Sequence, residues 1–303
     1  MRSGLEKTVP DCPSPIAEGQ IRSAALAIIK LSSAKVTPTA LTQILSEKYQ
    51  LTRKRSKSII RNLVADGELA YTYQYGSTYL ELSFNRPRKI SQFVILHPPG
   101  HSLHPAPGQV AVQIQPGASF GDGRHPTTRL AIRGIEMVLR QQVGGGSFSC
   151  AGVLDVGCGS GVLVIAAVRL GAAAGLGIDR DACALAEARH NVRLNMLENR
   201  IEISGRPLET IRGRFRIITA NLRYPSLRRL QPQLSALTAS GGVLVVSGIR
   251  DFELNDLLQF FAERRRICLW QQTEAGWGAA VLQQTDPGGG RGSPPGYGCF
   301  FSF

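Results

Sequence analysis

Three glycines at alternate positions, Gly157, Gly159 and Gly161, follow an apolar run that contains an aspartate, in the stretch VLDVGCGSGVL. Glycines placed in this way let the backbone turn tightly and pass close to a bound cofactor. The candidate cofactors are a nucleoside triphosphate, a nicotinamide dinucleotide and S-adenosylmethionine. A triphosphate loop needs Lys and then Ser or Thr after its last glycine, whereas Val162 and Leu163 stand there.

The spacing of the glycines also decides between the two remaining cofactors. A dinucleotide loop reads G-x-G-x-x-G, and counting from Gly157 puts Val162 where its third glycine belongs. The pattern G-x-G-x-G indicates S-adenosylmethionine instead. Asp179 stands at the end of the next expected strand, where a carboxylate can accept hydrogen bonds from both ribose hydroxyls. Both cofactors use such a residue, so only the glycine spacing discriminates.

A second stretch with chemical potential is FGDGRHPTT, residues 120–128, which lies shortly before the glycine loop. Pro126 is expected to begin a helix, whose free N–H groups favour an anion, and Thr127 and Thr128 add hydroxyl donors. The methionine carboxylate of S-adenosylmethionine is a suitable anion. His125 could help to remove a proton or could position the loop, and the sequence leaves both roles open.

Together, QPGASFGDGRHPTT, VLDVGCGSGVLVIAAVRLGA, GIDRD and ANLRYPSL resemble the PrmA family, the methyltransferases of ribosomal protein L11. The similar run covers residues 109–283 and includes EAGW near its end. The resemblance implies S-adenosylmethionine as the cofactor, a protein substrate such as a ribosomal protein, and methylation of amino groups. It implies cofactor contacts at Thr128, Gly157, Asp179 and Asn221, to which the glycine pattern adds Gly159 and Gly161.

The resemblance also implies a catalytic role for Asn221, whose carboxamide would accept a hydrogen bond from the incoming amine. The chain departs from the family in three places. Arg223 and Tyr224 replace small residues, and SGRPLE, residues 204–209, has no Asp for the adenine amine. A different N-terminal domain replaces the family's small α/β recognition module. The cofactor assignment is unaffected, and the identity of the substrate is less closely tied to the family.

The expected fold class is α/β, a Rossmann-like class I methyltransferase sheet in residues 109–284 with a smaller N-terminal winged-helix-like domain. Strands are expected at 110–114, 152–156, 175–178, 200–204, 215–220, 242–247, 267–272 and 278–283, and helices at 126–141, 161–170, 181–194, 225–236 and 251–262. Residues 86–108, rich in Pro, His and Gly, are expected to connect the domains, with one short strand at 93–96. Residues 1–15 and 285–303 are expected to be flexible.

The N-terminal domain, residues 16–85, is expected to hold helices at 17–31, 37–49 and 52–65 and then a hairpin around residue 76. This order resembles a winged helix, whose third helix reads nucleic acid. Arg53, Lys57 and Arg61 form a basic stripe on that helix. Nucleic acid is therefore a possible partner of this face, with protein docking as the alternative.

Composition limits the remaining choices. The net charge is +13, of which residues 1–90 contribute +7 and residues 91–303 +6, so an acidic partner suits both parts. Six scattered cysteines without a C-x-x-C pair are expected to be reduced thiols, and His97, His101 and His104 lie in a connector-like run, so no metal is expected. The absence of a long apolar run or a signal-peptide pattern predicts a cytoplasmic protein without membrane contact.

Four functions remain open at this stage. The first is a protein N-methyltransferase, and the second an RNA or DNA methyltransferase that holds nucleic acid with its N-terminal domain. Against the second, Asn221 is followed by Leu222, Arg223 and Tyr224 and not by the N–P–P–Y-like pattern of base-amine methylation. The third is a regulator that senses the cofactor without turnover, and the fourth a small-molecule methyltransferase.

Overall fold

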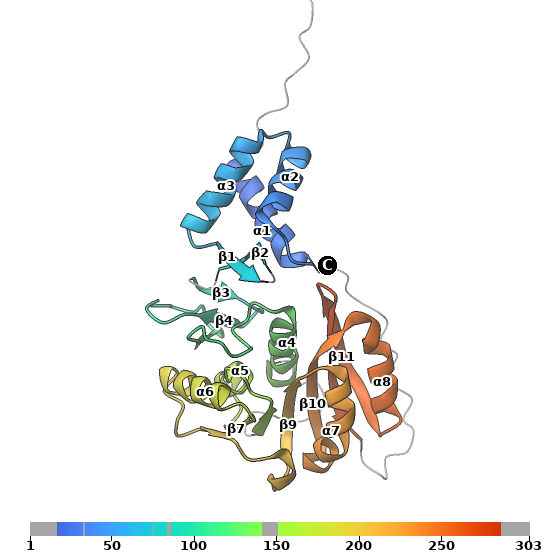
Figure 1. Cartoon of the computed structure of the whole chain (residues 1–303). Coiled ribbons are helices and arrows are strands. Elements are labelled where there is room, and N and C mark those ends of the chain that lie inside the picture. The colour runs from blue at the N-terminus through green and yellow to red at the C-terminus, as the bar shows by residue number, and fades with distance from the viewer. Residues whose placement is uncertain (1–16, 33, 75, 84–85, 141–150, 286–303) are drawn as a thin grey trace, which may run out of the picture. The chain divides into compact units, whose positions relative to one another are not determined.

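The computed structural model describes residues 17–285 except 33, 75, 84–85 and 141–150 (Figure 1). The chain forms two compact units that divide between Ser83 and Phe84. The predicted flexible N-terminus, and the predicted tail beyond Thr285, lie outside the described residues. Within the described ranges, no helix combines the length and the apolarity that crossing a bilayer would require.

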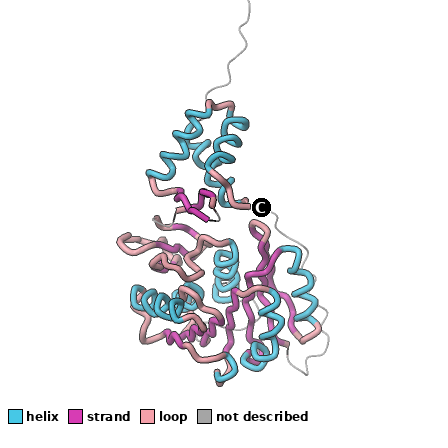
Figure 2. The backbone as a smooth tube through the Cα atoms, in the orientation of Figure 1, coloured by secondary structure: helices cyan, strands magenta, loops and turns pink. Residues whose placement is uncertain are grey.

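The first unit contains three helices followed by a two-stranded antiparallel sheet, in the order that the sequence predicts (Figure 2). The elements are α1 (Glu18–Leu31), α2 (Pro38–Tyr49), α3 (Arg53–Ala65), β1 (Leu69–Gln74) and β2 (Ser77–Leu82). The side chains of Thr37 and Thr52 cap α2 and α3 by accepting hydrogen bonds from the N–H groups of Ala40 and Arg55. Apolar residues from all three helices and both strands share one core. The winged-helix assignment stays a prediction.

The second unit is built on a seven-stranded sheet in the order β11-β12-β10-β9-β6-β7-β8. The five strands β10, β9, β6, β7 and β8 are parallel, whereas β12 runs antiparallel to both β10 and β11. Their bounds are β6 (Gly152–Val156), β7 (Ala174–Ile178), β8 (Ile201–Ser204), β9 (Phe215–Asn221), β10 (Thr238–Arg250), β11 (Arg266–Glu274) and β12 (Trp277–Gln284). This sheet confirms the predicted Rossmann-like α/β class.

Helices cover both faces of this sheet, and successive residues of a strand enter different cores. Val153 belongs to the cluster that includes residues of α4, α5 and α6, and its neighbour Leu154 to the cluster that includes residues of α7 and α8. The helices are α4 (Pro126–Arg140), α5 (Val162–Leu170), α6 (Ala182–Leu194), α7 (Tyr224–Leu237) and α8 (Leu254–Ala262), with short 3₁₀ turns η1 (Leu208–Thr210) and η2 (Asp251–Glu253). Burial on both faces explains why the strands read as continuous apolar runs.

The segment predicted to connect the domains differs in the structure. It forms β3 (Arg88–Lys89) and β4 (Val94–His97), which make a separate three-stranded sheet with β5 (Val110–Gln113). Val94 and Leu96 are buried in the core of the second unit, so this segment is an integral part of that unit. The strand expected near residue 110 is present, but it pairs with β4 and not with the central sheet. The short strand predicted at 93–96 is present as β4, whereas the two-residue strand β3 and the pairing of the three strands in a separate sheet were not predicted.

Substitution of Phe261 tests the packing of the core that includes residues of α7 and α8, because the Phe261 ring is fully buried there. We expect Phe261→Ala to lower the free energy of unfolding by about 3–5 kcal/mol through lost burial and a residual cavity. The matched substitution Phe252→Ala, at a ring that is 77% exposed, should change it by less than about 0.5 kcal/mol. Urea denaturation of both variants measures the difference, and equal losses would contradict this packing.

Candidate cofactor-binding site

The parallel strands β6, β7, β9 and β10 bring their carboxyl ends to one edge of the sheet, and the glycine loop follows β6 at this edge. The N–H groups of Gly157 and Cys158 donate to the carbonyl oxygen of Ile178, the last residue of β7, at 2.9 and 3.0 Å. Gly157 has φ +73°, and a Cβ atom there would lie 2.8 Å from the side chain of Leu222. The loop is therefore tied to the neighbouring strand, and a side chain at Gly157 would have to adopt a strained φ and displace the end of the Leu222 side chain.

Asp179 fixes the middle of the glycine loop. Its Oδ2 accepts a hydrogen bond from the N–H of Gly159 at 2.9 Å, and its Oδ1 accepts from the N–H groups of Arg180 and Asp181 at 2.7 and 3.0 Å. An ionised carboxylate offers about four acceptor positions, so three backbone donors leave at least one for a ligand. The structure thus shows Asp179 supporting the glycine loop, a role that the sequence did not predict, and the contact with the ribose stays a prediction.

The two stretches singled out in the sequence meet at this loop. The carbonyl oxygen of Phe120 accepts from the N–H of Ser160 at 2.9 Å, and the hydroxyl of Ser160 donates to the carbonyl of Gly121 at 2.9 Å. A Cβ atom on Gly159 would collide with the same Phe120 carbonyl. Gly159 is therefore required for the close approach of two backbone segments.

Gly161 has a different role from its two neighbours. It caps α5 with φ +79°, and a Cβ atom there would lie 3.2 Å from Cβ of Ala188 on α6. This close packing explains the glycine without a ligand, so its predicted contact with the cofactor stays a prediction.

The start of α4 is joined to the end of β9 through Ser247. The Ser247 hydroxyl donates to the carbonyl of Thr127 at 3.0 Å, and Ser247 pairs with Asn221 in the register of β10 and β9. Asn221 is half-buried, and its side chain makes no hydrogen bond with any described residue. The predicted residues Thr128 and Asn221 are thus brought to the same edge of the sheet.

Thr128 is fully buried, and its hydroxyl has no partner among the described residues. A buried hydroxyl without a partner costs free energy, so the site gains when a ligand satisfies it. The hydroxyl of the neighbouring Thr127, by contrast, lies 2.8 Å from Nδ1 of His125.

A cavity of about 210 Å³ opens beside the glycine loop. Of the predicted residues, Gly157 and Asp179 line it, whereas Thr128, Gly159, Gly161 and Asn221 do not. Its other lining residues come from the ends of β6 and β7, from the loop after β8 and from the start of α7: Val156, Ile178, Arg180, Arg206, Pro207, Leu208, Leu222, Ser226, Arg229 and Leu230. Apolar side chains from these elements suit a flat ring, and Asp179 suits the hydroxyls of an attached sugar.

His125 lies between two aromatic rings, with Phe120 at 5.1 Å and Trp277 at 4.7 Å between centroids. Burial, together with the positive charges of Arg129 and Arg250, lowers the pKa of His125 to about 4, and the negative charge of Asp122 opposes this only in part. The imidazole is therefore neutral at pH 7, a state in which it can accept a proton.

Glu274 anchors the start of α4 to the turn between β11 and β12. Its carboxylate receives Arg129 at 2.6 Å and Arg133 at 2.6 Å. Burial raises the pKa of Glu274, but the two guanidinium groups outweigh burial and hold the pKa below its ordinary value. These two ion pairs hold the helix that begins in FGDGRHPTT against the EAGW stretch, to which Glu274 belongs.

Two further ionisable groups are Asp155 on β6, just before the glycine loop, and Cys158 within the loop. Asp155 is fully buried and accepts a hydrogen bond from the Thr219 hydroxyl at 2.6 Å, and burial raises its pKa to about 7. Burial also raises the pKa of the Cys158 thiol, which keeps it protonated and suits a packing residue better than a nucleophile.

No group of His, Cys, Asp and Glu among the described residues has an arrangement that could hold a metal ion. His97 contacts the carbonyl of its neighbour Pro98 at 3.0 Å. The expectation of a protein without a metal stays a prediction.

Several residues of the site were missed in the sequence. Glu187 on α6 accepts from the N–H groups of Ala118 and Ser119 at 2.9 and 3.1 Å and thereby holds the approach to FGDG. Trp277 stacks under Arg250, 3.9 Å from the guanidinium carbon to the ring centroid, and contacts His125. Trp277 could have been found, since it belongs to EAGW, whereas Glu187 on a polar helix face gave no signal.

The sheet order, the glycine loop after β6 and the acidic residue after β7 define a class I methyltransferase fold. Residues 78–285 match the family model described as ribosomal protein L11 methyltransferase (PrmA). The chain belongs to this family.

Relatives support the assignment. The ribosomal protein L11 methyltransferase of Geobacter sulfurreducens is 40% identical over 163 residues, which are 54% of this chain and 51% of that protein. The Desulfotalea psychrophila protein of the same name is 32% identical over 65% of this chain and 64% of its own length. This chain thus spans between half and two thirds of these relatives. The solved ribosomal protein L11 methylase of Lactobacillus delbrueckii superposes with a TM-score of 0.59 and 28% identity, covering 66% of this chain and all of that one.

Gly159 provides a test of the close approach between the two stretches. We expect Gly159→Ala to lower the melting temperature by several degrees, because the new methyl group meets the Phe120 carbonyl at φ +52°. Gly241→Ala is the matched control, since Gly241 has a similar positive φ, +65°, but has open space around it. Calorimetry showing an equal effect at both positions would mean that backbone strain alone, and not the contact with Phe120, requires Gly159.

The lowered pKa of His125 predicts a pH dependence of stability. The folded His125 protonates near pH 4 and the unfolded one near pH 6.5, so the unfolded state binds the proton first as the pH falls. Stability from this group is therefore lost between about pH 6.5 and 4, by at most about 3 kcal/mol. His125→Gln should flatten the pH profile of urea denaturation in that window, whereas His190→Gln, at an exposed histidine, should not. If the wild type, His125→Gln and His190→Gln gave parallel profiles, the assignment of His125 as neutral in the folded protein would be refuted.

Proposed function

We propose that this chain is an S-adenosylmethionine-dependent protein N-methyltransferase that methylates amino groups of a ribosomal protein, as the names of its relatives indicate for L11. The observation that supports it best is the meeting of three features at one edge of the sheet: the glycine loop, the Asp179 carboxylate that holds it, and Asn221. Membership of the family links these features to methyl transfer.

The residues present fit the cofactor. Asp179 has an acceptor position left for a ribose hydroxyl, and Pro207 and Leu208 line the same cavity with apolar surface suited to adenine. The hydroxyl of Thr128 and the N-terminus of α4 are donors that suit the methionine carboxylate. When bound, S-adenosylmethionine supplies a methyl group on a positively charged sulfur.

The chain's own residues would then orient the amine. Asn221 ends β9 with a carboxamide that is not engaged by the described residues, so its oxygen can accept a hydrogen bond from an amine and fix the direction of its lone pair. With a pKa of about 4, His125 is a weak base for an ammonium group, so its neutral ring is better suited to positioning the loop, where Nδ1 lies 2.8 Å from the Thr127 hydroxyl. Arg223 and Tyr224 follow at the start of α7 and would set which substrates enter.

The other candidate functions differ in which molecule would receive the methyl group. An RNA or DNA methyltransferase would place the methyl group on nucleic acid, a small-molecule enzyme would need no macromolecule, and a cofactor-sensing regulator would bind without turnover. Among these, protein methylation agrees with the names of the relatives. The predicted cytoplasmic location accompanies this proposal.

Substitution of Asp179 tests the cofactor site. We expect Asp179→Ala to weaken binding of S-adenosylhomocysteine about 100-fold or more, because hydrogen bonds to a charged group contribute about 1.5–3 kcal/mol each and the glycine loop also loses its support. The control Asp256→Ala removes an exposed carboxylate on α8 and should bind as the wild type does. Titration calorimetry measures both, and unchanged affinity in Asp179→Ala would refute the assignment.

Substitution of Asn221 tests the proposed orientation of the amine. With purified ribosomal protein L11 and methyl-labelled S-adenosylmethionine, Asn221→Ala should lower kcat by 10-fold or more and spare much of the cofactor affinity. Asn199→Ala, at an exposed asparagine, is the matched control. Wild-type turnover by Asn221→Ala would remove Asn221 from the mechanism. Label appearing in ribosomal RNA and not in protein would favour the RNA alternative.

A further inference from the structure

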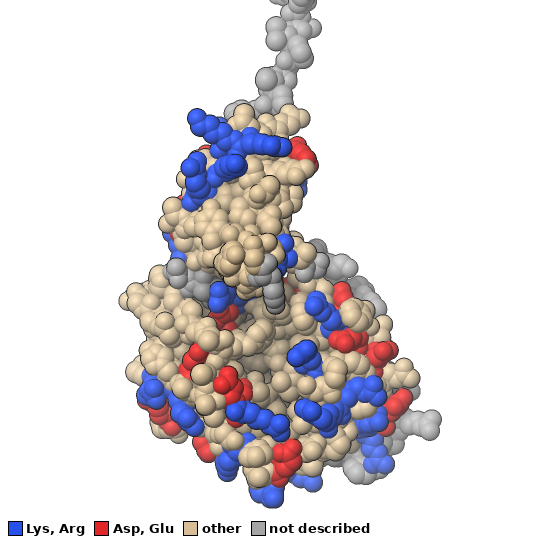
Figure 3. Space-filling view, viewed as in Figure 1, with Lys and Arg blue, Asp and Glu red and all other residues tan. Residues whose placement is uncertain are grey.

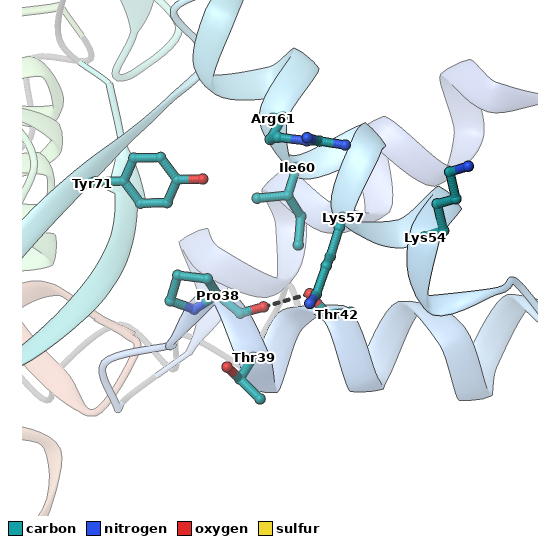
Figure 4. A pocket seen from close by; sticks show the side chains of 8 residues that line it. All are labelled: Pro38, Thr39, Thr42, Lys54, Lys57, Ile60, Arg61 and Tyr71. Atoms are coloured by element: carbon teal, nitrogen blue, oxygen red, sulfur yellow. Dashed lines mark hydrogen bonds between the residues drawn. The ribbon is translucent and has the colours of Figure 1, made fainter.

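A second cavity, of about 380 Å³, lies within the N-terminal unit and is independent of the methyltransferase site. Its walls come from α2, α3 and β1 (Figure 4), and we refer to it as the basic groove. It is lined by Pro38, Thr39, Thr42, Lys54, Lys57, Ile60, Arg61 and Tyr71. The family match begins at residue 78, so it assigns nothing to this groove.

The basic groove contains three cations and no carboxylate. Lys54, Lys57 and Arg61 lie three and four residues apart on α3, and none of them makes an ion pair within 4 Å of any described residue. Three other cations of this unit are paired: Arg22 contacts Asp66 at 2.6 Å, Lys35 contacts Glu81 at 3.8 Å and Arg55 contacts Glu18 at 3.6 Å. The Lys and Arg side chains gather visibly on this unit in Figure 3. The positive charge of the groove is therefore left for an external anion.

The first turn of α3 strengthens this argument. Arg53, Lys54 and Arg55 occupy it consecutively, and the turn has no acidic residue. The N-terminus of a helix carries partial positive charge, so cations there destabilise the isolated helix. An arrangement that costs stability in the free protein becomes favourable when a polyanion binds. Arg53, predicted to belong to the basic stripe, does not line the groove, whereas Lys54 does.

Aromatic rings stand beside these cations. Tyr71 and Tyr73 of β1 are 50% and 74% exposed, and they share one face of the strand because they are two residues apart. Tyr71 forms a wall of the groove and its hydroxyl points into it, while Lys57 extends from α3 toward α2 (Figure 4). Exposed tyrosines next to unpaired cations match the way in which proteins stack unpaired bases and hold phosphates.

We propose that the basic groove binds single-stranded RNA, with Lys54, Lys57 and Arg61 contacting phosphates and Tyr71 stacking on an unpaired base. A polyanion with flat rings accounts for the cations and the tyrosines together, whereas an acidic protein accounts only for the cations. The choice of RNA over DNA rests on the proposed function, since a ribosomal protein is found beside RNA. Such binding would hold the enzyme at its substrate.

Fluorescence anisotropy of a short labelled single-stranded RNA with the full chain tests this inference. In a plot of log affinity against log salt concentration, the negative slope should become smaller in magnitude by about 0.7 in Lys57→Ala and in Arg61→Ala. Each substitution removes one phosphate contact. Tyr71→Ala should weaken binding at least 5-fold through lost stacking, and Tyr71→Phe, which keeps the ring, should not. Lys30→Ala removes an exposed cation of α1 away from the groove and should change neither affinity nor slope.

Three results would overturn the proposal: no RNA binding by the folded wild type, equal binding by wild type and all groove variants, or tighter binding of polyglutamate or duplex DNA than of the RNA. The groove residues that are changed are exposed, so circular dichroism should show unaltered folding in each variant. No methyl donor is present, so failure here leaves the proposed methyl transfer intact, and RNA binding can be measured whether or not methyl transfer occurs.

Discussion

The site depends on one carboxylate. Asp179 accepts hydrogen bonds from three backbone N–H groups, one of them on Gly159 in the glycine loop. The loop cannot hold this conformation alone, because Gly157, Gly159 and Gly161 all have positive φ and little intrinsic preference for one shape. Asp179 from β7 and Phe120 before α4 hold it from two sides. The elements of the sheet are arranged so that these segments arrive at one edge.

Much of this site could be predicted from the sequence, because its glycines and its acidic residue follow the ends of apolar strands at a diagnostic spacing. The link between Phe120 and Ser160 could not, since hydrogen bonds to backbone carbonyls leave no residue signature. Of the sheet formed by β3, β4 and β5, the strands near residues 94 and 110 were predicted, but β3 and the pairing of the three strands were not. Its strands are two to four residues long, and the Pro- and Gly-rich run around His97 resembles a connector.

The two units carry their positive charge differently. In the second unit, Arg129 and Arg133 are paired with Glu274 in a half-buried network that fixes the start of α4. In the first unit, the cations of the basic groove have no such partner among the described residues. The net charge of +13 does not show which cations position parts of the protein and which are left for an external polyanion. Only the neighbours of each cation in the structure show this.

Intact-mass spectrometry of ribosomal protein L11 after incubation with this chain and S-adenosylmethionine tests the central claim most directly. Methylation of amino groups predicts that the L11 mass rises by whole methyl increments, and that fragmentation places them on lysines or the N-terminal amine. A mass unchanged after prolonged incubation, with a protein that demonstrably binds the cofactor, would contradict methyl transfer to this protein.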